Sequence, residues 1–127
     1  MRREPWQLIR ALVAALALTA ACNTPSVPLP PPLIGALSFV QPAPGQAILT
    51  GSPTSGHASA RFYVYNHTRA VGVIFTAAAD GSFMSPAFPA MTNDTAEIYY
   101  DTPIGERSQS ACVAIQFGVP LLSIGCP

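Results

Sequence analysis

Short apolar segments alternate with turn residues along the chain from Ile34 to its end. No segment in this region carries a sustained helical period, and many short strands at this spacing are typical of an all-β sandwich or barrel. The turn signal Asp80-Gly81 is the clearest, because both residues tolerate a positive φ in a tight hairpin. The predicted strands cover residues 36–40, 46–50, 60–66, 71–77, 82–88, 95–100, 108–117 and 120–125.

Strand alternation predicts which side chains enter the core of this sandwich. The side chains expected to point inward are those of Phe62, Val64, Val73, Phe75, Phe83, Ile98 and Tyr100. The same register places the opposite set on the outer face, namely Tyr63, Tyr65, Ile74, Glu97 and Tyr99. Because tyrosine is enriched at binding hot spots, the face that bears Tyr63, Tyr65 and Tyr99 is the candidate contact surface. The alternative is a solvated sheet face, since tyrosine is also a good strand former.

Residues 1–21 have the anatomy of an export signal. Three arginines among the first ten residues give a basic start, an apolar run covers residues 11–18, and small residues precede Cys22. This apolar stretch is shorter than the about 20 residues that a membrane-spanning helix needs. It therefore predicts a signal helix that is cleaved off, rather than a permanent transmembrane anchor.

The residues before Cys22 resemble the cleavage motif of bacterial lipoproteins, which is a leucine, two small residues and a cysteine. Here Leu18 sits one place early and Thr19 fills its position. The resemblance implies cleavage before Cys22, a lipid on its thiol, and a place in the bacterial cell envelope. Asn23 stands where an aspartate tends to mark inner-membrane retention, which favours the outer membrane, with the domain in the periplasm or at the surface. The alternative is cleavage by the ordinary signal peptidase, which leaves Cys22 as a plain thiol.

A proline-rich segment follows the signal. Residues 23–33 contain five prolines, which fix φ and remove amide donors, so we expect a polyproline II form. Such a tether could hold a domain on the order of 30 Å from the lipid, and a ligand for an aromatic groove is the alternative reading. The chain thus divides into a signal peptide (1–21), a lipidated cysteine with its tether (22–33) and a single antiparallel β-sandwich domain (34–127).

Cysteine usage constrains the end of the chain. With Cys22 lipidated, Cys112 and Cys126 remain as a pair in an oxidising compartment. Their midpoint falls within the turn-like residues 118–120, and a hairpin turning there sets the two cysteines across from each other, within disulfide range. We therefore expect an intramolecular disulfide between Cys112 and Cys126.

An ordered set of individually weak motifs runs through residues 60–108. It comprises FYVYN at 62–66, VIFTA at 73–77, DGSF at 80–83, ND at 93–94, EIYYD at 97–101 and GERS at 105–108. In this order the motifs resemble the immunoglobulin-like and carboxypeptidase-regulatory-like (prealbumin-type) modules of bacterial surface proteins, with Asn93 in place of their usual glycine. The resemblance implies a sandwich of seven or eight strands without catalytic residues, acting as a spacer, stabiliser or binding surface.

Chemistry-bearing residues are sparse. The sequence holds no recognised catalytic, metal or cofactor motif, so we expect no enzyme activity, no cofactor and no metal site. The two histidines, His57 and His67, lie in polar, turn-like stretches that predict surface positions. A calcium ion shared by Asp80, Asp94 and Asp101 is an alternative, although turn chemistry already explains each aspartate.

The charge composition and the predicted export signal together indicate a class of function. The chain has no lysine, and acids outnumber arginines after residue 21, so nucleic acid is excluded as a partner. We expect a lipid-anchored, non-catalytic envelope module that meets the membrane through its lipid and an envelope protein or polysaccharide through its surface. The alternatives are a small subunit or assembly factor of an envelope complex and, third, an enzyme with an unfamiliar site.

Overall fold

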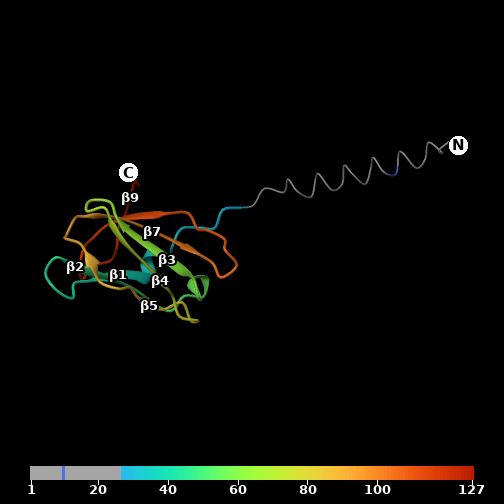
Figure 1. Ribbon diagram of the computed structural model, residues 1–127, viewed down its shortest axis with the longest axis horizontal. Helices are drawn as coiled ribbons and strands as arrows, with labels where there is room; N and C mark the ends of the chain where they lie inside the picture. Colours follow the sequence, from blue (N-terminus) through green and yellow to red (C-terminus); the bar gives the residue numbers. More distant parts are fainter. Residues whose placement is uncertain (1–9, 11–26) are drawn as a thin grey trace.

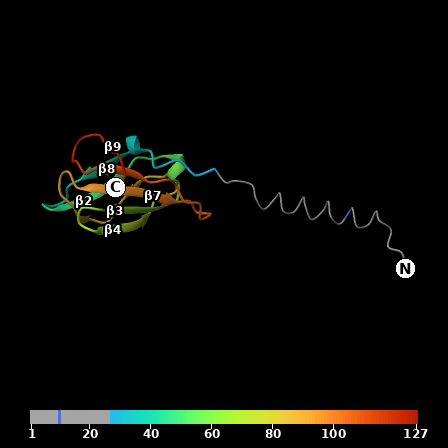
Figure 2. The same ribbon diagram turned by 90° about the horizontal axis from the view of Figure 1, so that it is seen from above.

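The computed structural model describes residue 10 and residues 27–127, so most of the predicted signal, and Cys22 with it, lies outside the described residues. Nine strands within residues 27–127 form two antiparallel sheets that pack face to face (Figures 1 and 2). The predicted all-β sandwich is confirmed. No helix of the described part is long and apolar enough to cross a membrane.

The smaller sheet is built around β2 (Gln46–Gly51), which pairs with β1 (Leu37–Val40) on one side. On its other side β2 pairs with two short strands, β5 (Phe83–Met84) near its end and β6 (Phe88–Pro89) near its start. All of these pairings are antiparallel. The sheet therefore covers one face of the core with one long central strand and three shorter neighbours.

The predicted strand at 82–88 is divided into β5 and β6 by Ser85. The Ser85 amide donates to the Leu49 carbonyl at 2.8 Å, while the Ser85 hydroxyl accepts from the Leu49 amide at 2.9 Å. Pro86 follows without an amide donor, so the regular ladder stops there. This break explains why the sandwich has nine strands where the sequence predicted seven or eight.

The larger sheet has five strands and carries the predicted outer face. Two 3-10 helices, η1 (Ile34–Ala36) and η2 (Ser55–His57), precede β1 and β3 in the chain. In spatial order the strands of the larger sheet are β4 (Val71–Thr76), β3 (Arg61–Asn66), β7 (Thr95–Asp101), β8 (Ala111–Ala114) and β9 (Ser123–Ile124).

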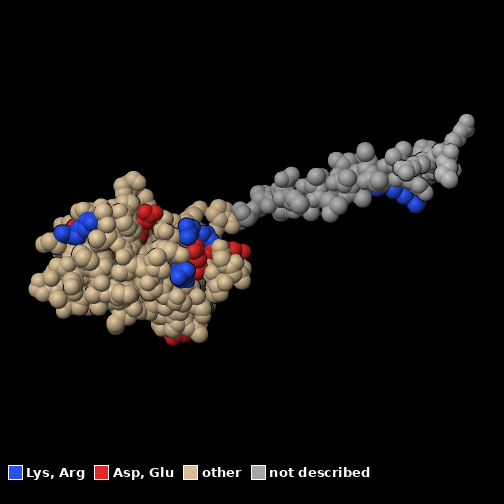
Figure 3. All heavy atoms as spheres, viewed as in Figure 1, with Lys and Arg blue, Asp and Glu red and all other residues tan. Residues whose placement is uncertain are grey.

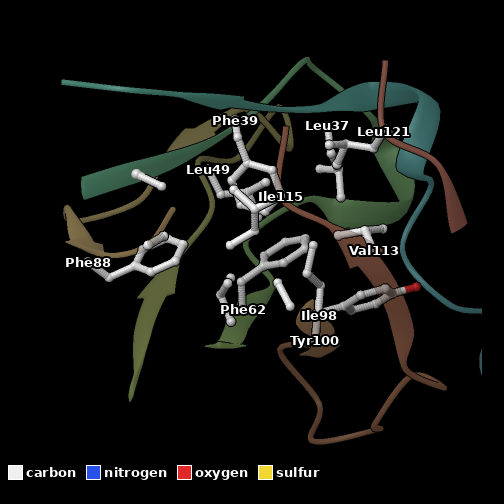
Figure 4. Close-up of a cluster of buried hydrophobic side chains, with 14 of the residues drawn as sticks. Leu37, Phe39, Leu49, Phe62, Phe88, Ile98, Tyr100, Val113, Ile115 and Leu121 are labelled. Atoms are coloured by element: carbon white, nitrogen blue, oxygen red, sulfur yellow. The ribbon is translucent and has the colours of Figure 1, made fainter. Parts of the chain in front are cut away.

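The hydrophobic core lies between the two sheets (Figure 4), and Phe62 of β3 is buried near its centre. The Phe62 ring lies 4.4 to 5.7 Å, centroid to centroid, from the rings of Phe75, Phe83 and Tyr100. The smaller sheet contributes buried side chains that include Phe39, Leu49 and Phe88. The predicted inward register is correct, because Phe62, Val64, Ile98 and Tyr100 are buried and Val73, Phe75 and Phe83 pack partly buried against them.

The predicted disulfide is present, although its geometry differs from a directly opposed pair. Cys112 and Cys126 are bonded, with their Cα atoms 5.1 Å apart. In the register of β8 and β9, Cys112 faces Ile124, so Cys126 lies beyond the end of β9 and reaches back. The connection is also wider than the expected hairpin, because the chain leaves the larger sheet after Ala114 and Phe117 forms a bridge with Phe39 of β1.

The end of the proline-rich segment lies against the sandwich instead of extending freely from it. Leu29 forms a parallel bridge with Ser108 and packs against the core, and its carbonyl accepts a hydrogen bond from the Gln109 amide at 3.0 Å. Pro32 is buried as well. The contacts of the folded part therefore begin before Ile34, so residues 29–33 are part of the folded module and do not act as a free spacer.

Candidate functional site

The outer side of β4, β3 and β7 carries the three tyrosines that the sequence singled out. In the register, Tyr63 lies between Ile74 and Tyr99, while Tyr65 lies between Gly72 and Glu97. Directly paired residues of an antiparallel sheet share one face, so these six positions form a grid two residues high and three strands wide. We call the side chains of Tyr63, Tyr65, Ile74, Glu97 and Tyr99 the tyrosine face.

A shallow groove of about 550 Å³ lies over the tyrosine face. Ile74 is 57% exposed and Tyr65 is 39% exposed, so these two side chains offer most of the free apolar area. Gly72 lies beside them, and a Cβ there would come within 2.6 Å of the Val64 carbonyl oxygen and 3.3 Å of the Tyr65 ring. Glycine thus lets the Tyr65 ring lie close to the backbone of β4.

Tyr63 and Tyr99 form a stacked pair that Arg107 covers. Their ring centroids are 4.8 Å apart and their planes differ by 10°. The Arg107 guanidinium lies 5.2 Å from the Tyr63 centroid and 4.9 Å from the Tyr99 centroid, a cation–π arrangement. Both rings are consequently less exposed than the predicted contact surface implied, and Tyr65 is the most accessible of the three tyrosines.

Asp101 holds Arg107 in place. Arg107 Nε donates to Asp101 Oδ1 at 2.8 Å and its Nη2 donates to Oδ2 at 3.0 Å, which is a two-point fork. The Tyr63 hydroxyl donates to the same Oδ2 at 3.1 Å. The hydrogen bonds from Arg107, together with the one from Tyr63, lower the pKa of the Asp101 carboxyl despite its partial burial. Both Tyr63 and Arg107 are therefore fixed by one ionised carboxylate.

A second polar group borders the other end of the groove. His67 Nε2 lies 2.7 Å from Glu97 Oε2, and the His67 ring meets the Tyr65 ring edge to face with centroids 4.8 Å apart. Ser110 Oγ donates to Glu97 Oε1 at 2.7 Å. The hydrogen bonds from Ser110 and His67 lower the pKa of the Glu97 carboxyl. Both carboxylates of this surface, Asp101 and Glu97, thus accept hydrogen bonds from neighbouring side chains.

Two residues of this surface were missed in the sequence interpretation, and both left a signal. His67 continues the outward series of Tyr63 and Tyr65, because every second residue of a strand points to one side. Arg107 lies opposite Asp101 in an antiparallel bridge, which the turn at Gly105 makes possible. Opposite charges that flank a turn after a strand, as Asp101 and Arg107 do, are the sequence signal for such a pair.

His57 corrects the expectation of a surface histidine. It ends the 3-10 helix η2 and is only 1% exposed, with its ring 5.1 Å from that of Phe62 and 5.3 Å from that of Tyr100. Nε2 accepts a hydrogen bond from the Leu33 amide at 3.4 Å, and Nδ1 has no hydrogen-bond partner among the described residues. Burial lowers the pKa of His57. The histidine is therefore a core residue that favours its neutral form.

The three aspartates considered for calcium do not meet. No three His, Cys, Asp or Glu side chains come together as a metal site in residues 27–127. Asp94 instead accepts hydrogen bonds from Asn66 Nδ2 at 2.9 Å, from the Met91 amide at 2.9 Å and from Arg69. Burial raises the pKa of Asp94, but these hydrogen bonds outweigh it and keep the pKa below its ordinary value.

Comparison with known proteins found no matching family model, no matching curated protein and no matching solved structure. The likeness of residues 60–108 to immunoglobulin-like and carboxypeptidase-regulatory-like modules therefore rests on its motifs alone. The sandwich and its tyrosine face, in contrast, are observed in the structure.

Proposed function

We propose that this chain is a lipid-anchored, non-catalytic module of a bacterial cell envelope that binds a partner through its tyrosine face. The export signal and Cys22 support a location in the cell envelope, and the sparse titratable side chains support a binding role over catalysis. The observation that carries the binding role is the groove over Tyr65 and Ile74, where exposed apolar area lies between two polar borders.

The chemistry of the face suggests an uncharged partner. Glu97 is the one carboxylate that lines the groove, and hydrogen bonds from Ser110 and His67 satisfy its oxygens, while Arg107 is paired with Asp101, so the groove itself offers little free charge to a strongly charged ligand. The flat ring of Tyr65 can bury large area at a small cost in side-chain freedom. Hydrogen-bonding groups at both ends can orient what lies between them. A neutral polysaccharide or a weakly polar protein surface fits this combination.

The binding role is tested by removing the exposed apolar side chains only. A Tyr65→Ser/Ile74→Ser variant changes the groove without disturbing the Tyr63–Tyr99–Arg107 stack, whereas replacing all three tyrosines would also remove that support. Met84→Ser is the matched control, because Met84 is 71% exposed on β5 of the smaller sheet. Crosslinking and pull-down from detergent-solubilised envelope should lose the captured partner in the double variant and keep it in the control.

Retention of every crosslink by a double variant of unchanged stability would contradict the binding role. The face would then be an ordinary solvated sheet surface. Thermal unfolding of both variants shows whether a loss of binding reflects the surface itself or a loss of folding.

The anchor is tested separately. We expect the mature protein to begin at Cys22 and to carry diacylglycerol on that thiol. Mass spectrometry of the protein purified from membranes measures both, and Cys22→Ser should release the protein from the membrane fraction. An unmodified N-terminus at another residue would contradict the anchor and would leave the binding test unaffected.

The open edge of β4 supports the alternative of a subunit in an envelope complex. Among the described residues β4 pairs only with β3, and its six residues include neither a charge nor a proline, the features that commonly block an exposed edge. A partner strand could add to this edge. Hydrogen exchange on the captured complex separates the two modes, because an added strand protects the outward amides of β4 and a ligand on the tyrosine face does not.

A further inference from the structure

The N-terminal segment leaves the sandwich at one defined end. Leu29 bridges Ser108, and residues 27–29 line a shallow hollow together with Glu106 and Arg107. The segment is therefore attached beside the connection between β7 and β8. Figure 1 shows the start of this segment and the β7–β8 connection at the same end of the molecule, with the turn between β1 and β2 at the opposite end.

The stretch of chain between this attachment and Cys22 is short. Only five peptide steps separate Cys22 from Val27, and a fully extended chain covers about 3.6 Å per residue. The Cα atom of Val27 can then lie no farther than about 18 Å from that of Cys22. A lipid on Cys22 would hold this end of the sandwich close to the membrane surface.

The same end presents an exposed apolar side chain on a braced turn. Within Thr102–Glu106, the Gly105 amide donates to the Thr102 carbonyl at 2.9 Å, and the Thr102 amide donates to the Glu106 carbonyl at 2.8 Å. Ile104 stands at this turn with 81% of its surface exposed. A side chain this apolar and this exposed gains free energy on entering a lipid interface.

Charge at this end is balanced. Arg61 and Arg107 lie here together with Asp101 and Glu106, and Figure 3 shows both signs close together on the sandwich, near the point where the described N-terminal segment meets it. Anionic lipid therefore neither repels this end nor holds it strongly by charge. The contact with the membrane depends on the lipid and on the apolar tip.

We propose that the β7–β8 turn is a membrane-contacting tip, which inserts Ile104 into the lipid interface beside the lipidated Cys22. This inference rests on the lipid anchor of the proposed function. It fixes the orientation of the module, because β7 then runs toward the membrane. Tyr63 and Tyr99 lie nearer to the lipid than Tyr65, and the tyrosine face stands upright on the membrane surface.

Depth measurements on the full-length lipidated protein test this tip. Ile104→Cys and Ala43→Cys are each labelled with an environment-sensitive fluorophore, without reduction, so that the Cys112–Cys126 disulfide stays closed. Ala43 lies in the turn between β1 and β2, at the far end of the sandwich. In phosphatidylcholine vesicles with spin-labelled lipid, we expect a blue shift and quenching at position 104 and neither at position 43.

The two proposals fail in distinguishable ways. A probe at position 104 that behaves like the probe at position 43, in protein whose Cys22 lipid is verified by mass, would overturn the membrane-contacting tip and leave the anchor standing. Absence of the lipid on Cys22 would overturn both. The Cys22→Ser protein with the probe at position 104 serves as the unanchored control, and we expect no blue shift from it in the same vesicles.

Discussion

Phe62 is the side chain on which most of the aromatic core converges. It is fully buried, and its ring neighbours come from four different elements, η2, β4, β5 and β7. Phe62→Ala should lower the free energy of unfolding by about 3–5 kcal/mol, because both burial and packing are lost. Phe75→Ala should cost clearly less, since Phe75 is only partly buried at the edge of the cluster. Urea unfolding of both variants measures this order, and equal costs would contradict the packing described here.

His57 should give the fold a pH dependence. Its folded pKa lies below the unfolded value near 6.5, so the unfolded chain binds more protons between those two pKa values. Stability is fully present above pH 6.5 and is lost as the pH falls through 6.5 toward the folded pKa. Urea unfolding at pH 7.5 and pH 5 should show this loss.

His57→Phe should reduce that loss, because a phenyl ring can fill the space between Phe62 and Tyr100 and does not titrate. His67 is present in both proteins, so the difference between them isolates His57. An identical decline in the variant and the original chain would show that His57 does not cause the pH dependence.

Glycine is required at position 81 of the Asp80-Gly81 turn for two independent geometric reasons. Gly81 has a φ of +87°, and a Cβ there would lie 1.9 Å from the Thr54 carbonyl oxygen. Gly105 provides a matched control, with a φ of +88° and open space around its Cα. Gly105→Ala should cost about 1–2 kcal/mol for the left-handed backbone alone. Gly81→Ala should cost considerably more in a thermal or urea unfolding experiment, and equal costs would show that the turn can move away from Thr54.

Strands were predictable where local pattern and tertiary packing agree. Alternation of Phe62, Val64 and the tyrosines between them has one solution when one face is buried, so the register of β3 followed from the sequence. The break at Ser85 was not predictable in this way, because it depends on hydrogen bonds to Leu49, far away in the chain. His57 was misplaced for the same reason, since the rings that bury it come from β3 and β7.

The tyrosine face shows the same limit. Its three tyrosines and Ile74 follow from alternation, so the candidate surface was found from the sequence. The cover that Arg107 provides depends on a loop folding back, which periodicity does not describe. In the structure the accessible contact area of the tyrosine face is consequently offered by Tyr65 and Ile74 more than by the Tyr63–Tyr99 pair.

The attachment of the N-terminal segment determines how the proposed lipid anchor and the tyrosine face are placed relative to each other. Proline content predicted a free spacer over residues 23–33, because proline disfavours helix and sheet interiors. It does not prevent docking, since the bridge at Leu29 uses a carbonyl and an apolar side chain, which neighbouring prolines leave intact. The length of chain between Cys22 and this attachment limits how far the tyrosine face can stand from the membrane.

Truncation measures that attachment directly. A protein that begins at Ile34 loses the Leu29 side chain from the core, the hydrogen bond from Gln109 and the donor that Leu33 offers to His57. Compared with a protein that begins at Val27, we expect it to be less stable by about 2–3 kcal/mol, from one partly buried leucine and its hydrogen bonds. Urea unfolding of the two proteins gives the difference.

Within the longer protein, Leu29→Ser should reproduce much of this loss, while Val27→Ser should be neutral because Val27 is 89% exposed. These two substitutions separate the docked leucine from a general effect of chain length. Equal stability of the proteins that begin at Val27 and Ile34 would mean that residues 27–33 form a free spacer. The module could then turn about a longer tether, and the orientation inferred for its β7–β8 end would lose its support.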